Sequence, residues 1–542
     1  MSLNDLNLFI ESGKNVLSLL CQLTERSTVL NWIAREIAGM RGLPCYLWNL
    51  GQGRFRCVHI EHTKTAELVG EYKLPMDVLE YLIQEAPCGV FVLENLQSFL
   101  EVAHQDFQSQ VHHERLASQV INVLNAWEDD SSRYLILLGS QEVGLPPRLA
   151  SIVPEVCNPL PRYEDNVVLL EEFLPTLDEN ADLSLVPQLA LSAGGLTHQE
   201  IKSGLRLVKA KNGGKIDSTL IKSLLNYKIE RLKAFNLSFT PRPNVQNFGG
   251  MDRIRTAIYG VKQDYAHKAR EMGIPLPKGW LFVGPPGTGK TFVSKFCASI
   301  LEFPMISVDT GAICASQQRF AIASGGASYL RRLIDRIEAS APAVVYFDEL
   351  DKLFPDPGQP ADVSQRQVLG LLLTWLQDKV SQTFVIATLN RLDSLPPELT
   401  RLGRFDEIFY VGFPQAGERK DILHLHLARF DSRYRDGNSP LSEKEWRVIL
   451  NRTVNCTGAE LSTMVEKAAK KQFHINPDAE VRIDLKELLE VREEITPLYV
   501  RDTDRILKIE NIAKHVATPC SSPDQSVYAP PVTTFWGQKV DR

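Results

Sequence analysis

Long apolar runs and paired cysteines are both missing from this 542-residue chain. The richest apolar run, residues 368–376, has about half of the roughly 18–20 residues that a membrane helix requires. No C-x-x-C pair occurs among the nine cysteines, and the first residues lack the basic and apolar segments of a secretory signal. We therefore expect no membrane span and no secretion. The thiols are expected to be small core residues in a reducing compartment.

An excess of either charge is missing as well. The chain has 60 Lys and Arg residues and 66 Asp and Glu residues, which gives a formal net charge of −6. A protein that binds phosphate backbones over its whole surface is more basic than this. A basic stretch at residues 205–215 has no interleaved aromatic residues that could stack on bases. We therefore do not expect nucleic acid as a partner.

The overall composition, with 44% hydrophobic and 23% charged residues, is that of a globular protein. Short apolar runs alternate with amphipathic stretches, a pattern typical of parallel α/β structure. Polar breaks rich in Gly, Pro or Ser interrupt this pattern and mark domain boundaries. The predicted organisation is an α/β domain at 1–180, a helical connector at 181–240, a second α/β domain at 241–414, a helical lid at 415–515 and a flexible tail at 516–542.

A complete phosphate-binding pattern, G-x-x-x-x-G-K-[ST], lies between an apolar strand and a helix in the second α/β domain. Its glycines let backbone N–H groups surround phosphate oxygens, and the next helix adds its positive N-terminal end. Lys290 is expected to reach the β- and γ-phosphates, and the Thr291 hydroxyl to bind Mg²⁺. The residues predicted to bind the nucleotide here are Gly284, Pro285, Pro286, Gly287, Thr288, Gly289, Lys290 and Thr291.

Two further strands end in polar side chains. Asp348 and Glu349 follow the apolar run at 342–347, and Asn390 ends the next predicted strand. Asp348 is placed to hold Mg²⁺ through water, and Glu349 to polarise the attacking water. Asn390 is expected to orient that water. These residues predict a site for hydrolysis of a bound nucleotide.

Two arginines, Arg401 and Arg404, come before the fourth strand. If they lie beyond the next helix, they cannot easily reach the γ-phosphate bound to their own chain. They are therefore predicted to act as fingers in a neighbouring subunit's site, where guanidinium charge stabilises the transition state. The alternative is that both are surface arginines in local ion pairs.

GPPGTGKT, VVYFDELDK, ATLN and LPPELTRLGRFDEIF, in this order and spacing, resemble the AAA family of ring-forming ATPases. The resemblance implies a P-loop α/β module, with helices on both faces of a parallel sheet, followed by a helical lid. It also implies ATP and Mg²⁺ as ligands and a homo-oligomeric ring, expected to be a hexamer. NCTGAELSTMVEKAAKK resembles the lid motif and places Gly458 and Ala459 near the adenine. NFGGMDRIRTAIYG resembles the segment that contacts the base around Gly249 and Gly250.

A closer resemblance covers nearly the whole chain. GGMDRIR, MGIPLPKGWLFVG, LLLTWLQDKVSQTFVIAT and EITPLYVRDTDRI resemble the divergent AAA ATPases of the hypothetical chloroplast reading-frame family. That family occurs in algal plastids and cyanobacteria and has been tied to photosynthesis or the regulation of carbon uptake. The resemblance therefore implies a cytoplasmic protein, in a cyanobacterial cytoplasm or a plastid stroma.

Two departures from the AAA pattern bear on function. Rings that thread substrates carry an aromatic–apolar–Gly triplet on a central loop, whereas residues 311–328 offer Phe320 without such a triplet. The zinc motif H-E-x-x-H of the membrane proteases is also missing, because Ala117 stands where His113-Glu114 would require the second histidine. We expect no protease activity.

The first α/β domain resembles a second copy of the same module. LPCYLWNLGQG, GVFVLENL and LILLGSQEVGLPPRL match FPMISVDTGAI, AVVYFDEL and VIATLNRLDSLPPEL in order and without gaps. The phosphate loop is replaced by residues 18–34, which contain neither glycine nor lysine, and the carboxylate pair becomes Glu94-Asn95. We expect this copy to be degenerate and free of nucleotide.

Two functions follow from these features. The first is an ATP hydrolase that remodels or regulates a protein partner, which the intact Glu349, Arg401 and Arg404 favour. The second is a nucleotide-gated scaffold with slow turnover, which the altered central loop favours.

Overall fold

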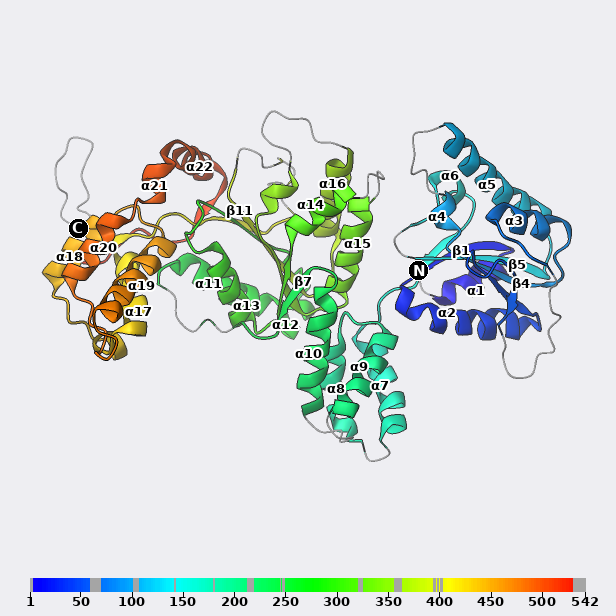
Figure 1. Ribbon diagram of the computed structural model, residues 1–542, viewed down its shortest axis with the longest axis horizontal. Helices are drawn as coiled ribbons and strands as arrows, with labels where there is room; N and C mark the ends of the chain where they lie inside the picture. The colour runs from blue at the N-terminus through cyan, green and yellow to red at the C-terminus, as the bar shows by residue number, and fades with distance from the viewer. Residues whose placement is uncertain are drawn as a thin grey trace. The chain divides into compact units, whose positions relative to one another are not determined.

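The computed structural model describes residues 3–58, 70–100, 107–140, 143–178, 181–211, 219–243, 245, 249–319, 325–354, 363–392, 396, 399 and 403–529. The chain forms two compact units, which are described separately (Figure 1). The first comprises residues 1–231 and 315–340, and the second residues 232–314 and 341–542. Each unit contains a largely parallel sheet, which confirms the predicted α/β fold.

The sheet of the first unit has the order β3-β2-β4-β5-β1-β6. Its strands are β1 (Val16–Cys21), β2 (Cys45–Trp48), β3 (Arg56–Cys57), β4 (Gly89–Glu94), β5 (Arg133–Ser140) and β6 (Glu155–Cys157). The helices around it are α1 (Leu3–Glu11), α2 (Arg26–Trp32), α3 (Pro75–Gln84), α4 (Gln97–Leu100), α5 (Phe107–Ala126) and α6 (Pro147–Ala150). All strand pairs are parallel except β2 with β3.

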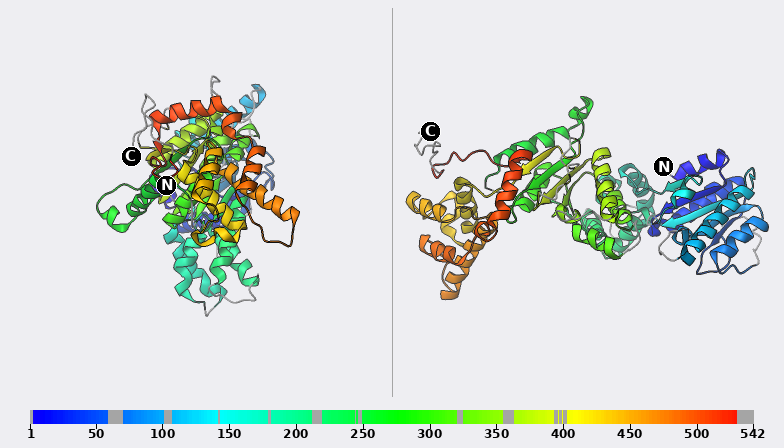
Figure 2. Two further views of the ribbon diagram at one scale, coloured as in Figure 1. Left: turned by 90° about the vertical axis from the view of Figure 1, so that its left-hand side faces the viewer. Right: turned by 90° about the horizontal axis from the view of Figure 1, so that it is seen from above.

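Both faces of this sheet are covered. On β4, Val90 and Val92 pack in a core with α1 and α2, whereas Phe91 and Leu93 pack in a core with α3 and α5. The helices on each face can be followed in Figures 1 and 2. A strand buried on both faces has no polar side, which explains why β4 reads as a continuous apolar run.

Helices α7 (Tyr163–Leu177), α8 (Val186–Ala193), α9 (His198–Lys211) and α10 (Thr219–Lys233) share a core of their own. Leu170 and Leu174 of α7 pack there with Ile201 of α9 and Leu224 of α10. This arrangement differs from the predicted boundary at residue 180, because α7 packs with the helices that follow it. The predicted connector is therefore part of a larger helical cluster.

The sheet of the second unit has the order β13-β12-β8-β11-β10-β9-β7. Its strands are β7 (Leu237–Thr240), β8 (Gly279–Val283), β9 (Met305–Val308), β10 (Ala343–Phe347), β11 (Thr383–Leu389), β12 (Glu407–Tyr410) and β13 (Thr518–Pro519). The helices next in sequence to these strands are α11 (Asp252–Asp264), α12 (His267–Glu271), α13 (Lys290–Leu301), α14 (Thr310–Arg319), α15 (Gly325–Glu338) and α16 (Val363–Asp378). Helices α11 and α13 cover one face through Ile254, Ile258 and Val293.

The helical lid consists of α17 (Ala416–Phe430), α18 (Glu443–Arg452), α19 (Gly458–Ile475) and α20 (Leu485–Glu494), and α21 (Leu498–Arg501) and α22 (Thr503–Val516) follow. The chain then returns to the sheet as β13, which pairs with β12. Cys520 is buried, and the Ser521 hydroxyl donates to Glu418 Oε1 over 2.6 Å. Residues 518–521 therefore differ from the flexible tail predicted from composition.

The two sheets share one strand order, as the predicted repeat requires. Read from β6, the first sheet has the order β6-β1-β5-β4-β2, and read from β12, the second has the order β12-β8-β11-β10-β9. The three matched sequence segments coincide with β2 and β9, β4 and β10, and β5 and β11. Asn95 and Glu349, which are equivalent in the match, both adopt left-handed backbone angles, with φ of 60° and 49°.

The similarity extends into the helical clusters. In the helix after β6 and in the helix after β12, the third residue accepts a hydrogen bond from the backbone N–H before the helix: Arg162 N donates to Asp165 over 2.9 Å and Gln415 N to Glu418 over 2.8 Å. Helices α9 and α19 both begin with a T-x-x-E box, from Thr197 and Thr457 respectively. Helices α7 and α9 are thus the counterparts of α17 and α19, and the repeat is longer than its strands indicated.

Helix α15 clusters with the first unit although β9 and β10 flank it in sequence. Its Arg336 is 1% exposed and donates to Gly195 O over 2.9 Å and to Gln22 Oε1 over 2.8 Å. Arg336 also lies 3.4 Å from Glu200, which is buried as well. A buried guanidinium is stable only when such partners surround it, so Arg336 depends on these contacts.

Candidate nucleotide site

The phosphate loop connects β8 to α13. Gly287 and Gly289 have φ angles of +80° and +105°, which residues other than glycine rarely adopt. A Cβ on Gly284 would lie 2.2 Å from the carbonyl oxygen of Val411, so this position also requires glycine. The sequence thus produces the concave backbone that a phosphate group needs.

Lys290 is the first residue of α13 and is only 7% exposed. Its Nζ donates to the carbonyl oxygens of Gly284 and Pro285, each over 2.8 Å. Burial lowers the pKa of this ammonium to about 8, although the nearby carboxylates of Asp351 and Asp348 act in the opposite direction. A buried cation with only carbonyl partners in the loop gains from an anionic ligand, so the loop fits a phosphate group.

Asp348 lies directly after β10, and two side chains hold its carboxylate. Its Oδ1 accepts a hydrogen bond from Thr388 over 2.8 Å and lies 2.9 Å from the Tyr346 hydroxyl. The same hydroxyl lies 2.9 Å from Thr291 Oγ1. Tyr346 therefore links the two residues predicted to hold Mg²⁺. Hard oxygen donors of this kind fit that cation.

Glu349 takes a left-handed conformation that turns it away from the strand direction. Its backbone N–H donates to Thr388 Oγ1, and its Oε1 accepts from Asn390 Nδ2, both over 2.9 Å. Its Oε2 also pairs with Lys352. The structure therefore brings together Glu349 and Asn390, which the sequence predicted to act on the same water.

One cavity of about 470 Å³ contains most of the predicted residues. The predicted residues that line it are Gly249, Pro286, Gly287, Thr288, Gly289, Lys290, Thr291, Asp348, Glu349, Asn390, Gly458 and Ala459. Gly284 and Pro285 instead accept the hydrogen bonds of Lys290. Gly250 packs against Glu418, which a Cβ there would approach to 2.0 Å.

Neither predicted arginine finger lines this cavity in the part of the chain that the structure describes. Arg404 is half-buried in the turn before β12, and Arg401 lies outside the described residues. Phe320 of the central loop also lies outside them. The trans role of the two arginines stays a prediction.

Several residues at this site were not predicted from the sequence. The remaining lining residues are Met251, Phe292, Ile422, Leu425, His426 and Ser462. Ile422, Leu425 and His426 lie on α17, and Ser462 on α19, where Ala459 N also donates to Gly287 O over 3.1 Å. No sequence pattern marks these helix faces. Tyr346 was recognisable in principle, since a residue two positions before Asp348 lies on the same side of the strand.

The same edge of the first sheet carries different chemistry. Glu94, the counterpart of Asp348, is 8% exposed and pairs with Arg26 through two guanidinium nitrogens. Burial opposes ionisation of Glu94, but hydrogen bonds from Arg26 and Asn49 hold its pKa below the usual value. Arg26 is the first residue of α2, as Lys290 is of α13. An internal ion pair thus connects the positions that a nucleotide would bridge in the second unit.

Comparison with known proteins agrees with this geometry. Residues 280–413 match the family described as "ATPase family associated with various cellular activities (AAA)". This segment runs from β8 to just beyond β12, so the second unit contains an AAA domain.

Similarity to particular proteins extends further along the chain. The chain is 26% identical over 443 residues to the "Uncharacterized AAA domain-containing protein ycf46" of Trieres chinensis. The aligned segment covers 81% of this chain and 83% of that protein. The protein of the same name from Pyropia yezoensis is 29% identical over 62% of this chain and 67% of its own length. The "ATP-dependent zinc metalloprotease FtsH 1" of Thermoanaerobacter sp. is 35% identical over 38% of this chain and 32% of its own length. The chain is thus similar to ycf46 proteins over most of its length.

None of the helices in the described ranges combines the length and the apolar character needed to cross a membrane.

A first prediction concerns Tyr346, because its hydroxyl contacts both proposed metal ligands. Tyr346→Phe should raise the Mg²⁺ concentration needed for half-maximal ATP turnover by about tenfold, since outer-shell partners of metal ligands contribute roughly 10–100-fold to affinity. A Mg²⁺ titration of ATPase activity measures this. Tyr434→Phe, which removes a buried hydroxyl bonded to Ile483 O in the lid, is the control. Equal Mg²⁺ requirements in both variants would contradict the metal assignment.

Proposed function

We propose that this chain binds Mg-ATP in the 470 Å³ cavity and hydrolyses it. The observation that supports this most is that Lys290, the pair Asp348 and Glu349, and Asn390 meet at one cavity from separate segments. Phosphate contact alone would not need an acid whose carboxylate is held by a neighbouring amide. The combination favours a hydrolytic site over simple nucleotide storage.

Each residue has a role in this proposal. Lys290 and the loop N–H groups hold the β- and γ-phosphates. Thr291 and Asp348 hold Mg²⁺, which when bound neutralises charge on the phosphate oxygens. Glu349 takes a proton from the attacking water, and Asn390 orients the Glu349 carboxylate.

The base and sugar would lie beyond the loop. Met251, Ile422 and Leu425 give that end of the cavity an apolar wall, and Gly249, Gly458 and Ala459 let the backbone approach closely. Because α17 and α19 supply part of this wall, nucleotide binding would also hold the lid against the loop. Movement of the lid during turnover is how hydrolysis would reach a partner.

We further propose a ring of identical chains, expected to be hexameric, in which Arg401 and Arg404 complete the neighbouring site. The position of Arg404 away from the cavity of its own chain supports this reading. The ring would remodel or regulate a protein partner in a cyanobacterial cytoplasm or plastid stroma, with a role in photosynthesis or carbon-uptake regulation. Similarity to ycf46 proteins supports this setting.

A nucleotide-gated scaffold with slow turnover is the second candidate. The pairing of Glu349 Oε2 with Lys352 favours it, because this oxygen then contacts an ammonium group in place of an attacking water. Turnover and assembly should be measured together across ATP concentrations, by phosphate release and light scattering. A rate well below one per minute, with assembly that depends on ATP binding alone, would favour the scaffold.

A second prediction tests the shared site. Lys290→Ala and Arg404→Ala subunits should each be inactive alone, and a mixture should recover part of the activity. The first variant supplies intact fingers and the second supplies intact phosphate loops. Phosphate release from mixtures of known ratio measures the recovery. Mixtures as inactive as either variant, with subunit exchange confirmed by fluorescence transfer, would argue against shared sites.

A further inference from the structure

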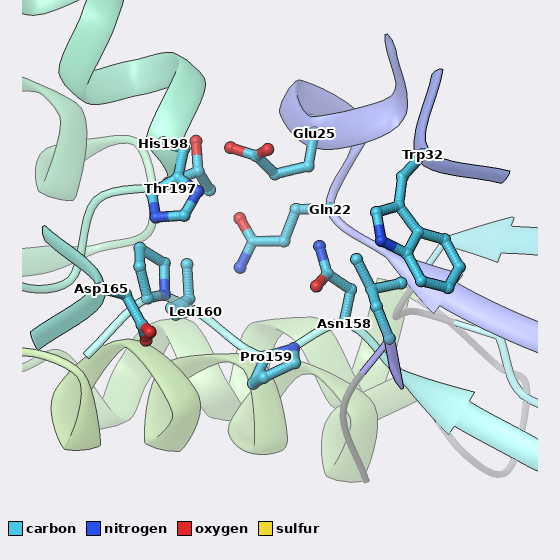
Figure 3. Close-up of a pocket in the computed structure, with 11 residues that line it drawn as sticks. Gln22, Glu25, Trp32, Asn158, Pro159, Leu160, Asp165, Thr197 and His198 are labelled. Carbon is cyan, nitrogen blue, oxygen red and sulfur yellow. The ribbon is translucent and has the colours of Figure 1, made fainter. Parts of the chain in front are cut away.

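The first unit contains a cavity of about 280 Å³ at the carboxyl ends of β1 and β6 (Figure 3). Gln22 and Glu25 line it from the loop after β1, Trp32 from the end of α2, and Asn158 from the segment after β6. Asp165 of α7 and His198 of α9 complete the polar part of the wall. Figure 3 shows Trp32 at one end of the cavity and His198 at the other. In open α/β sheets, ligands bind in crevices beyond the carboxyl ends of the strands.

Two structural positions that line this cavity have counterparts at or next to the proposed nucleotide site of the second unit. Asp165 and Glu418 are the third residues of equivalent helices and each accepts from the backbone N–H before its helix, and His198 and Gly458 are the first residues of another equivalent pair. In the second unit Gly458 lines the 470 Å³ cavity, and Glu418 lines an adjoining cavity of about 150 Å³. The cavity of the first unit therefore corresponds in position to the lid side of the nucleotide cavity together with the cavity that adjoins it.

The phosphate end is closed in the first unit. Four residues, 22–25, separate β1 from α2, whereas six, 284–289, separate β8 from α13. Arg26 is held by Glu94, as described above. The Glu25 carboxylate also accepts a hydrogen bond from Gln199 N over 2.9 Å, so it occupies the N-terminal end of α9. A protein carboxylate and an ion pair thus replace the loop that binds anions.

The chemistry of the cavity wall agrees with this difference. Two carboxylates, Glu25 and Asp165, line it, and neither lysine nor arginine does within the described part of the chain. Burial lowers the pKa of His198, so its ring adds no positive charge near neutral pH. His198 Nε2 is buried without a hydrogen-bond partner among the described residues. Such a wall repels anions and suits an uncharged ring that carries N–H donors.

We propose that this cavity binds an uncharged purine nucleoside of the adenosine type. The inference rests on the proposed function in one respect, since the second unit's cavity is interpreted there as a nucleotide site. The Trp32 ring offers a stacking surface, and carboxylate and amide oxygens accept from the exocyclic amino group. The volume is slightly below the roughly 300–1,000 Å³ of typical ligand sites, which suits a nucleoside without phosphates.

Calorimetry on the full-length chain tests this in two steps. The protein is first saturated with Mg-AMP-PNP, a non-hydrolysable ATP analogue, which fills the site at Lys290. Adenosine is then titrated into the saturated protein. We expect one further equivalent per chain with a Kd on the order of 100 µM, and at least tenfold weaker binding of AMP. An absent second step, or AMP binding as tight as adenosine, would overturn the inference.

Variants assign the second step to this cavity. Trp32→Ala should weaken adenosine binding at least fivefold, because stacking on one aromatic ring contributes about that much or more. Trp32→Phe should retain most of the affinity. Leu23 is an exposed residue in the segment after β1 and does not line the cavity. Leu23→Ala should therefore leave adenosine binding unchanged. Equal affinity in Trp32→Ala and the native chain would overturn the assignment.

A photolabel covers the case in which Trp32→Ala fails to fold. In native protein saturated with AMP-PNP, 8-azidoadenosine should label peptides that contain residues 22–32 or 158–165. Labelling confined to other peptides would overturn the inference. Failure of the first calorimetric step would count against the proposed ATP site, whereas failure of the second step alone would count only against this cavity.

Discussion

Glu349→Gln should bind Mg-ATP with nearly the native affinity and hydrolyse it roughly 10²–10⁴ times more slowly. The amide keeps the size of the carboxylate and can still contact Asn390, so the cavity is preserved. It cannot accept a proton from the attacking water. Asp348 and Thr291 remain in place to hold Mg²⁺. Single-turnover hydrolysis and calorimetric ATP binding, measured on the same preparation, separate the two effects.

The repeat supplies a matched control for this variant. Asn95 has the same left-handed backbone and the same place after its strand as Glu349. Asn95→Gln should therefore leave both ATP binding and turnover unchanged. Native turnover in Glu349→Gln would transfer the role of base to another carboxylate, with Asp351 the nearest candidate, since it accepts from Asn390 N. Reduced turnover in Asn95→Gln would show that the first unit contributes to hydrolysis.

The parts of the site that the sequence predicted lie within short segments of chain. The phosphate loop, the Asp348-Glu349 pair and Asn390 each follow an apolar strand, and the ends of neighbouring parallel strands meet at one edge of a sheet. Strand order then brings them together without any further information. Local pattern and topology were therefore enough to predict most residues that would touch phosphate or metal.

The residues at the base end required knowledge of packing between distant helices. Ile422 and Leu425 lie on α17 and contribute to the cavity from an ordinary amphipathic helix. The extent of the repeat was underestimated for a related reason. Helices α7 and α9 keep the N-terminal hydrogen bonds of α17 and α19, but capping residues of this kind are a weak signal beside three ungapped strand matches.

Only part of the chemistry of the first unit could be predicted from the sequence. The loss of the glycines and the lysine could be read directly, and it predicts the loss of phosphate binding. The ion pair that replaces them could not be predicted from the sequence, because Arg26 and Glu94 are 68 positions apart and neither belongs to a motif. Arg26 takes the position at the start of α2 that Lys290 takes at the start of α13, and this equivalence is a property of the folded chain.

This equivalence gives the last prediction, a pair of matched substitutions with opposite effects. Lys290→Ala should weaken ATP binding about 10–100-fold, because it removes a charge-assisted phosphate contact that contributes about 1.5–3 kcal/mol. Without nucleotide its melting temperature should be equal to the native value or slightly higher, since the variant no longer buries an ammonium group. Calorimetric titration and thermal unfolding measure the two quantities.

Arg26→Ala should do the reverse. It leaves the buried Glu94 carboxylate with Asn49 but without its guanidinium partner, which costs about 1–3 kcal/mol. The melting temperature should fall by about 3–10 °C, while ATP affinity stays at the native value. Mg-ATP stabilises any chain that binds it by RT ln(1 + [L]/Kd), so it should raise the melting temperature of Arg26→Ala by the native amount and that of Lys290→Ala by clearly less. If Arg26→Ala lost ATP affinity instead of stability, Arg26 would be a phosphate ligand and the first unit a second nucleotide site.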